Sequence, residues 1–150
     1  MRRALHISMC LVVGVTLSGL PAAGSDLGAY RWKSRLLLIF SPSASHPVLE
    51  ELERILAMNH AEVIDRDLVI FRVYEDGPSK AGQQPLSPED SEKLRRRYKI
   101  NTGRLTVILI GKDGGIKLVR QHRADLQEIF DLIDSMPMRR QEMREKAYNR

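Results

Sequence analysis

Cysteine is nearly absent from this chain of 150 residues, which contains only Cys10. Cys10 lies in an N-terminal segment that we interpret as a signal peptide, and its preceding residues, Ile7-Ser8-Met9, do not place a small residue directly before it, as expected for a lipid-carrying cysteine. Without that segment the chain has no thiol, so it can form no disulfide, thiolate nucleophile or thiolate metal site. Its composition thereby excludes thiol–disulfide exchange and cysteine-dependent peroxidase chemistry.

A strong excess of one charge is also missing. The formal net charge is +5, from 24 Lys and Arg against 19 Asp and Glu, and removal of Arg2 and Arg3 leaves 22 against 19, or +3. This balance favours anionic surfaces only weakly and gives no reason to expect nucleic-acid binding.

The first 24 residues have the pattern of a secretory signal. Arg2 and Arg3 precede an apolar segment that runs to Leu20 without an acidic residue, and small residues end at Gly24. This pattern predicts cleavage near Gly24 and Ser25 and a periplasmic or secreted protein. An uncleaved anchor is the alternative, but the apolar run is short for a membrane span, so we do not expect an integral membrane protein.

The stretch from Arg35 to Val48 organises the rest of the chain. Leu36–Phe40 is a continuous apolar run, which is typical of a strand covered on both faces. Ser41-Pro42-Ser43 consists of residues that favour turns and predicts the end of this strand. A helix then begins at Pro47, with Ser45 or His46 as its N-cap.

The remaining segments predict a further series of strands and helices. In order they are a strand at 68–74, a loop at 75–85, a helix capped at Ser87 and ending near Lys99, a strand at 105–110, an Asp113-Gly114 turn, an edge strand at 116–121 and a helix from Asp125 to Met136. Within the middle helix, we interpret Arg95–Arg97 as a solvated face rather than an anion site. In the lead-in at 25–34, we expect Trp32 to pack over a sheet edge, with a surface contact as the alternative.

This order, β-α-β-α-β-β-α, is that of the thioredoxin fold. It predicts an α/β domain at residues 35–137 with a four-stranded mixed sheet and helices on both faces. Ser45-His46-Pro47-Val48 falls where a thioredoxin has Cys-Gly-Pro-Cys, so the proline matches while both cysteines are replaced. The cis-proline that thioredoxins place before the third strand is also missing, because Leu105 precedes Thr106.

A narrower resemblance covers nearly all of the chain after residue 24. It rests on four segments: Trp32-Lys33, Arg66-Asp67, Leu109 to Gly115 and Ile133 to Met143. Together they resemble a thioredoxin-like family of unknown function, found in exported bacterial proteins and in vertebrate sushi-repeat extracellular-matrix proteins. The resemblance implies an exported thioredoxin-like domain and brings no established catalytic residues with it.

Candidate catalytic residues are few. Ser45 beside His46 suggests a nucleophile and its base, but adjacency in sequence does not place the imidazole on the hydroxyl, and an N-cap role explains Ser45 equally well. A metal site would need His46, His60 and His122 closer together than the predicted fold brings them. We therefore expect no catalytic, metal or cofactor site.

Candidate binding residues fall in three places. They are the sheet end with Ser41, Ser43, Ser45, His46 and Pro47, the loop at 75–85, and the C-terminal tail at 138–150 with Arg139, Arg140 and Arg144. The serines and free helix N–H groups suit an anion, although no basic residue lies in that turn. The tail is either a frayed, solvated helix end or a basic arm for a partner or an anionic surface.

We conclude from the sequence that this is an exported, redox-inactive binding domain for a protein partner or an anionic surface. Two alternatives remain open, namely a hydrolase-type enzyme that uses Ser45 and His46, and a purely structural envelope protein.

Overall fold

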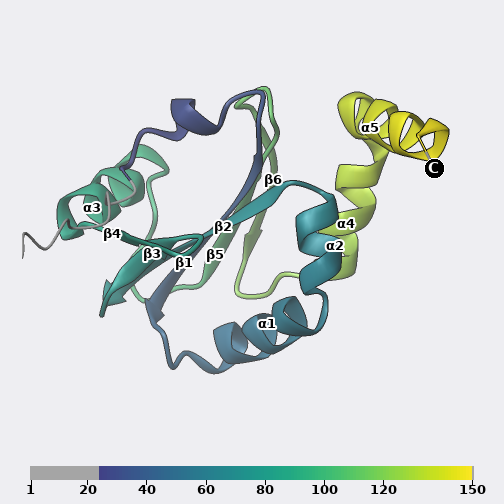
Figure 1. Ribbon diagram of the computed structural model, residues 1–150. Coiled ribbons are helices and arrows are strands. Elements are labelled where there is room, and N and C mark those ends of the chain that lie inside the picture. Colours follow the sequence, from purple (N-terminus) through teal and green to yellow (C-terminus); the bar gives the residue numbers. More distant parts are fainter. Residues whose placement is uncertain (1–23, 150) are drawn as a thin grey trace, which may run out of the picture.

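The computed structural model describes residues 24–149, so Cys10 and nearly all of the predicted signal peptide lie outside the described residues. Figure 1 shows a twisted central sheet with helices on both faces. The elements are η1 (Leu27–Tyr30), β1 (Arg35–Ser43), α1 (Pro47–Met58), α2 (His60–Asp65), β2 (Leu68–Asp76), β3 (Ser79–Ala81), β4 (Gln84–Leu86), α3 (Pro88–Arg97), β5 (Thr106–Ile110), β6 (Ile116–Gln121), α4 (Leu126–Ser135) and α5 (Pro137–Tyr148). In this part of the chain, no helix has the length and apolar character needed to cross a membrane.

The sheet is mixed, with β1 at its centre. Its strand order is β4-β3-β2-β1-β5-β6, in which β1 runs parallel to β2 and antiparallel to β5, and β6 is antiparallel to β5. A parallel pair joined through a helix, followed by an antiparallel hairpin, is the arrangement that the sequence predicts.

The sheet has six strands rather than the predicted four. Residues 75–85, predicted to be a loop, contain most of the β3–β4 hairpin, which pairs with β2 through Phe71 and Ala81. Gly82, at φ +57°, allows the tight turn between the two strands. Each strand is three residues long and has no apolar run, so the periodicity of the sequence gives no sign of it.

Two apolar clusters lie on the two faces of the sheet. Successive side chains of β1 point to opposite faces, so that Leu37 and Ile39 pack with α1, α2 and α4, whereas Leu38 and Phe40 pack with η1 and α3. This double coverage is the reason why β1 is a continuous apolar run.

The predicted helix starts are confirmed. The hydroxyl of Ser87 accepts a hydrogen bond from the backbone N–H of Asp90 at 3.0 Å, and Asp125 caps α4 by accepting from the N–H of Gln127 at 2.9 Å. Pro137 ends α4 and occupies the first turn of a further helix, α5. Most of the predicted tail is therefore a regular helix, which Figure 1 shows beside α4.

Candidate functional site

The end of β1 and the start of α1 hold the residues that the sequence singled out for chemistry. Ser41 is fully buried, and its hydroxyl donates to the carbonyl oxygen of Ser43 at 2.9 Å. The hydroxyls of Ser43 and Ser45 lie 3.3 Å apart. His46, not Ser45, is the N-cap residue of α1, and Pro47 is the first helical residue. Ser45, directly before this N-cap residue, is exposed and does not cap the helix.

Ser45 and His46 do not form a nucleophile–base pair. Among the described residues, the hydrogen-bonding neighbour of the Ser45 hydroxyl is Ser43, and none joins it to His46. The Nδ1 atom of His46 is buried without a hydrogen-bond partner in the described part of the chain. Hydroxyl attack needs a base within hydrogen-bond reach and a group that orients that base, and this geometry supplies neither.

The three histidines after the predicted signal peptide lie apart from one another in the fold. His60 begins α2 and His122 follows β6, and both are exposed. Within residues 24–149, no group of three His, Cys, Asp or Glu side chains is placed to hold a metal ion.

An apolar groove opens beside the predicted binding end of the sheet. Its volume is about 550 Å³, and it lies between α1 and the start of α4. Its apolar lining is formed by Pro47, Val48, Leu52, Ile55, Ala124, Leu126 and Phe130. Pockets of roughly 300–1,000 Å³ with an apolar lining and a few polar groups are typical of ligand sites. The structure therefore connects Pro47, named from the sequence, to a groove that the sequence did not reveal.

Charged side chains border this groove. Glu51 accepts two hydrogen bonds from Arg54, at 3.0 and 2.6 Å, and these lower the pKa of the Glu51 carboxyl. Asp125 is occupied in capping α4. Arg123 has no hydrogen bond or ion pair from its side chain to any described residue. The rim of the groove thus has one positive charge that no described side chain binds directly, although Arg123 lies close enough to Glu51 to contribute to the lowering of the Glu51 pKa.

The opposite end of the sheet carries a set of buried cations. Arg35, the first residue of β1, is only 1% exposed and binds both carboxylate oxygens of Glu142 at 3.1 Å. Lys112, the second residue after β5, binds Glu142 at 2.8 Å and Asp67 at 2.7 Å. Burial opposes the ionisation of Glu142, but hydrogen bonds from Arg35 and Lys112 outweigh it, so its pKa lies below the ordinary value.

A second group of ion pairs continues from the first. Arg139 of α5 is 2% exposed and binds Asp134 at 3.0 Å as well as Asp65. Arg66 binds the other oxygen of Asp134 at 2.5 Å. Hydrogen bonds from Lys146 and then Arg139 lower the pKa of Asp65 to about 2. We call the eight residues Arg35, Asp65, Arg66, Asp67, Lys112, Asp134, Arg139 and Glu142 the ionic network.

The ionic network brings together three of the four segments on which the family resemblance of the sequence rests. Arg66-Asp67, Lys112 and the long segment from Ile133 to Met143 are distant in sequence and meet here. This network was not predicted from the sequence. One feature indicated it, because Arg35 directly precedes the five apolar residues of a buried strand. Because each buried cation has an acidic partner, the network is well suited to a structural role.

The predicted basic tail residues are separated by the structure. Arg139 is buried in the ionic network and is not available to a partner. Arg140 and Arg144 are exposed on α5, and their side chains form no ion pair with any described residue. The three consecutive arginines of α3 are separated likewise, since Arg95 is buried on Glu75 at 2.6 Å while Arg96 and Arg97 are exposed.

The fold is that of thioredoxin-like proteins, as likeness to solved structures shows. The 2-Cys peroxiredoxin of Plasmodium vivax, in its reduced form, superposes with a TM-score of 0.57 at 15% identity over 73% of this chain and 80% of that chain. Mycobacterium tuberculosis AhpC gives a TM-score of 0.53 at 14% identity over 71% of this chain and 70% of that chain. At such identities the likeness concerns the fold alone.

The chain belongs to the family described as Domain of unknown function (DUF4174), which matches residues 26–142. A curated relative, coiled-coil domain-containing protein 80 of zebrafish (Danio rerio), is 27% identical over 133 residues, covering 78% of this chain. The match spans only 15% of that relative's length. The expected membership of a thioredoxin-like family of unknown function is confirmed.

Proposed function

We propose that this chain is an exported, redox-inactive binding module that holds a segment of a protein partner in the groove between α1 and α4. The observation that carries the proposal is the position of the groove. It opens at Pro47 and Val48, within the segment where a thioredoxin has its reactive cysteines and where this chain has Ser45 and Val48 in their places. The groove at this position supports a binding role, and the lack of cysteine in the segment supports the absence of thiol chemistry.

Composition supports the absence of redox chemistry. The single cysteine, Cys10, falls within the predicted signal peptide, and thiol–disulfide exchange requires a thiolate. The same N-terminal pattern supports export to the periplasm or the medium.

The groove favours a partner segment of particular chemistry. Val48 and Ile55 are half-buried on one wall and Ala124 on the other, so an apolar side chain inserted between them would be removed from water. Arg123 stands on the rim and forms no ion pair with the residues that the structure describes. We infer that the partner presents an apolar side chain with an acidic residue close to it.

Site-specific photocrosslinking in cells tests this proposal. A photoreactive residue at Val48 faces the groove, whereas one at Met58 lies on the same helix but outside the groove and is 73% exposed. We expect a discrete crosslinked partner from Val48 and not from Met58. The crosslinked peptide should contain the apolar and acidic residues described above.

Charge reversal of Arg123 provides the control for specificity. Arg123→Glu should strongly reduce the crosslink from Val48, and a compensating change of the partner's acidic residue to lysine should restore it. Equal crosslinking from Val48 and Met58, or a crosslink that is indifferent to Arg123→Glu, would reject the groove as the binding surface. Thiol-dependent reductase activity in the exported protein would reject the redox-inactive assignment.

A further inference from the structure

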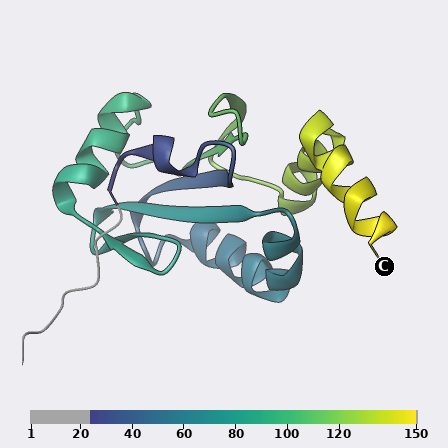
Figure 2. The same cartoon turned by 45° about the horizontal axis from the view of Figure 1, so that its top comes forward.

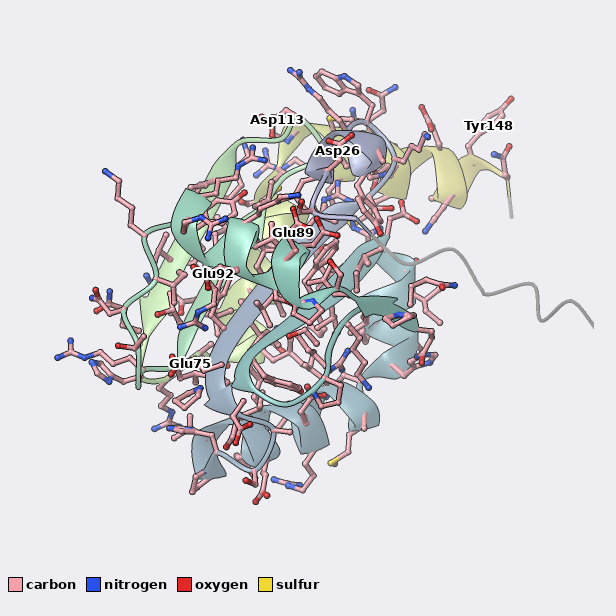
Figure 3. All side chains as sticks on the ribbon, turned by 90° about the vertical axis from the view of Figure 1, so that its left-hand side faces the viewer. Asp26, Glu75, Glu89, Glu92, Asp113 and Tyr148 are labelled. Carbon is pink, nitrogen blue, oxygen red and sulfur yellow. The ribbon has the colours of Figure 1, made fainter. Side chains whose placement is uncertain are left out.

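A second cavity, remote from the groove between α1 and α4, lies on the α3 side of the sheet. Its volume is about 400 Å³, and η1, the end of α3 and the β5–β6 turn line it. Both Figure 1 and Figure 2 show η1 between α3 and the β5–β6 turn. Figure 3 labels Asp26, which caps η1, and Asp113 of the turn at the same end of the molecule.

The floor of this cavity is apolar and fixed in place. Leu36 and Ile110 are buried side chains of the sheet. Tyr30 packs edge-on against Phe71 with ring centroids 5.4 Å apart, and Tyr98 packs against Phe40 at 6.1 Å. Burial raises the pKa of both tyrosines, so they stay uncharged and present flat, neutral surfaces to the cavity.

Two arginines, Arg31 and Arg97, also line this cavity, and neither has an acidic partner among the described residues. The side chains of Arg31 and Arg97 form no hydrogen bond or ion pair with any residue between 24 and 149. Each lies near a neighbouring aromatic ring, Arg31 at 5.2 Å from that of Trp32 and Arg97 at 5.6 Å from that of Tyr98. The cavity therefore has two positive charges that the described residues do not neutralise.

The acidic side chain that lines the cavity is already engaged. Asp113 accepts hydrogen bonds from Lys117 at 2.7 Å and from the backbone N–H of Gly115 at 3.0 Å. These contacts lower the pKa of Asp113 and tie its carboxylate to the turn. Arg31 and Arg97 are thus free to bind an added anion.

The position of Arg31 is set by a strained turn. Trp32 adopts a left-handed backbone with φ +65°, which is uncommon for a bulky residue, and the residue is 59% exposed instead of packing over a sheet edge. The N–H of Trp32 donates to the carbonyl of Lys112 at 2.7 Å, which fixes the turn against the end of β5. A Cβ on Gly114 would lie 3.8 Å from Nε of Arg31, so the guanidinium lies over the glycine turn. Strain of this kind is concentrated at functional sites.

We propose that this cavity binds a small organic carboxylate with an apolar body. The carboxylate lies between the guanidinium groups of Arg31 and Arg97, whose planar donors match its two oxygens, and the body rests on the floor formed by Tyr30, Tyr98 and Ile110. The cavity volume is within the range of about 300–1,000 Å³ that is common for small-molecule sites. This site shares no residue with the groove proposed for the protein partner, so either proposal can fail alone.

The test is a titration with 3-phenylpropanoate in phosphate-free buffer, with 3-phenylpropan-1-ol as the uncharged analogue. Two-dimensional NMR of the ¹⁵N-labelled protein follows the backbone amides of Gly28, Gly114 and Gly115, which line the cavity. The fluorescence of Trp32, the single tryptophan, provides a second readout beside Arg31. We expect saturable shifts at these glycines with the carboxylate and binding of the alcohol that is weaker by about tenfold or more.

Matched substitutions separate the proposed site from general charge effects. Arg31→Gln and Arg97→Gln should each weaken carboxylate binding by about tenfold. Arg96→Gln, one residue away on the same helix and paired with Glu92, should leave the affinity unchanged. Absence of saturable shifts at the three glycines, equal affinity for the alcohol, or an affinity indifferent to both Arg31→Gln and Arg97→Gln overturns the proposal.

Discussion

Arg35 and Glu142, which are 107 residues apart in the chain, form a bidentate ion pair in which each terminal guanidinium nitrogen lies 3.1 Å from one carboxylate oxygen. Arg35 opens the central strand and Glu142 lies on α5, so this contact ties the C-terminal helix to the start of the sheet. Loss of Glu142 would leave the charge of Arg35 buried without its partner, so removal of one member of the pair should be strongly destabilising.

Removal of the Glu142 charge tests this relationship. We expect Glu142→Gln to lower the free energy of unfolding by about 3 kcal/mol, because Arg35 and Lys112 then lose their shared carboxylate inside the protein. Urea unfolding followed by circular dichroism measures the change. Glu145→Gln, an exposed change on the same helix, should alter stability by less than about 0.5 kcal/mol. Equal effects of the two substitutions would show that burial of Arg35 does not depend on Glu142.

Truncation of the chain distinguishes a structural helix from a detachable arm. If residues 138–150 were only a basic arm, their removal would leave the fold intact. The structure instead predicts that a chain ending at Met136 unfolds at a clearly lower urea concentration, because it lacks both Arg139 and Glu142. A chain ending at Lys146 retains both and should unfold like the full chain. An unchanged midpoint for the shorter chain would contradict a structural role of α5.

Acidic pH should weaken the ionic network. The pKa of Asp65 is lowered from 3.8 to about 2, and that of Glu142 is also lowered, so both carboxyls bind protons more weakly in the folded state than in the unfolded state. Their contribution to stability is complete above the unfolded pKa values, near pH 4, and is lost as the pH falls towards 2. The thermal midpoint should therefore fall across this window.

Two substitutions identify the source of this pH dependence. Asp65→Asn removes one titrating group and should flatten the fall of the thermal midpoint between about pH 4 and about pH 2. Asp131→Asn, an exposed change on α4 whose side chain accepts a hydrogen bond from Gln127, should leave the profile as it is. A profile that is just as steep for Asp65→Asn as for the unaltered protein would assign the effect to other carboxyls.

The capping of α3 gives a local prediction. Ser87→Ala should lower the free energy of unfolding by about 1 kcal/mol, because the N–H of Asp90 loses its acceptor at the helix start. Ser135→Ala, a change at the exposed C-terminal end of α4, is a suitable comparison and should cost less. Denaturant unfolding of both variants measures the difference. An unchanged free energy of unfolding for Ser87→Ala would mean that water replaces the hydroxyl as acceptor for the N–H of Asp90.

The fold was largely predictable from local sequence patterns. The apolar run Leu36–Phe40 indicates a strand buried on both faces, and Pro47, Ser87 and Asp125 mark helix starts that the structure confirms. These signals depend on residues close together in the chain, since a cap, a turn and a hydrophobic stripe are each formed within a few positions. The β3–β4 hairpin escaped prediction because its strands are stabilised by pairing with β2 rather than by their own pattern.

The candidate sites were much less predictable. The groove at Pro47 and the cavity at Arg31 are each formed by segments distant in sequence, and no local pattern shows that Arg31 and Arg97 line the same cavity.

The sequence by itself determined the order of the elements and the near absence of cysteine, because both can be read along the chain. Only the tertiary structure decided which charges are buried. A charged residue such as Arg139 has the same local pattern whether it faces water or the interior, and its environment depends on partners, here Asp65 and Asp134, that folding brings to it.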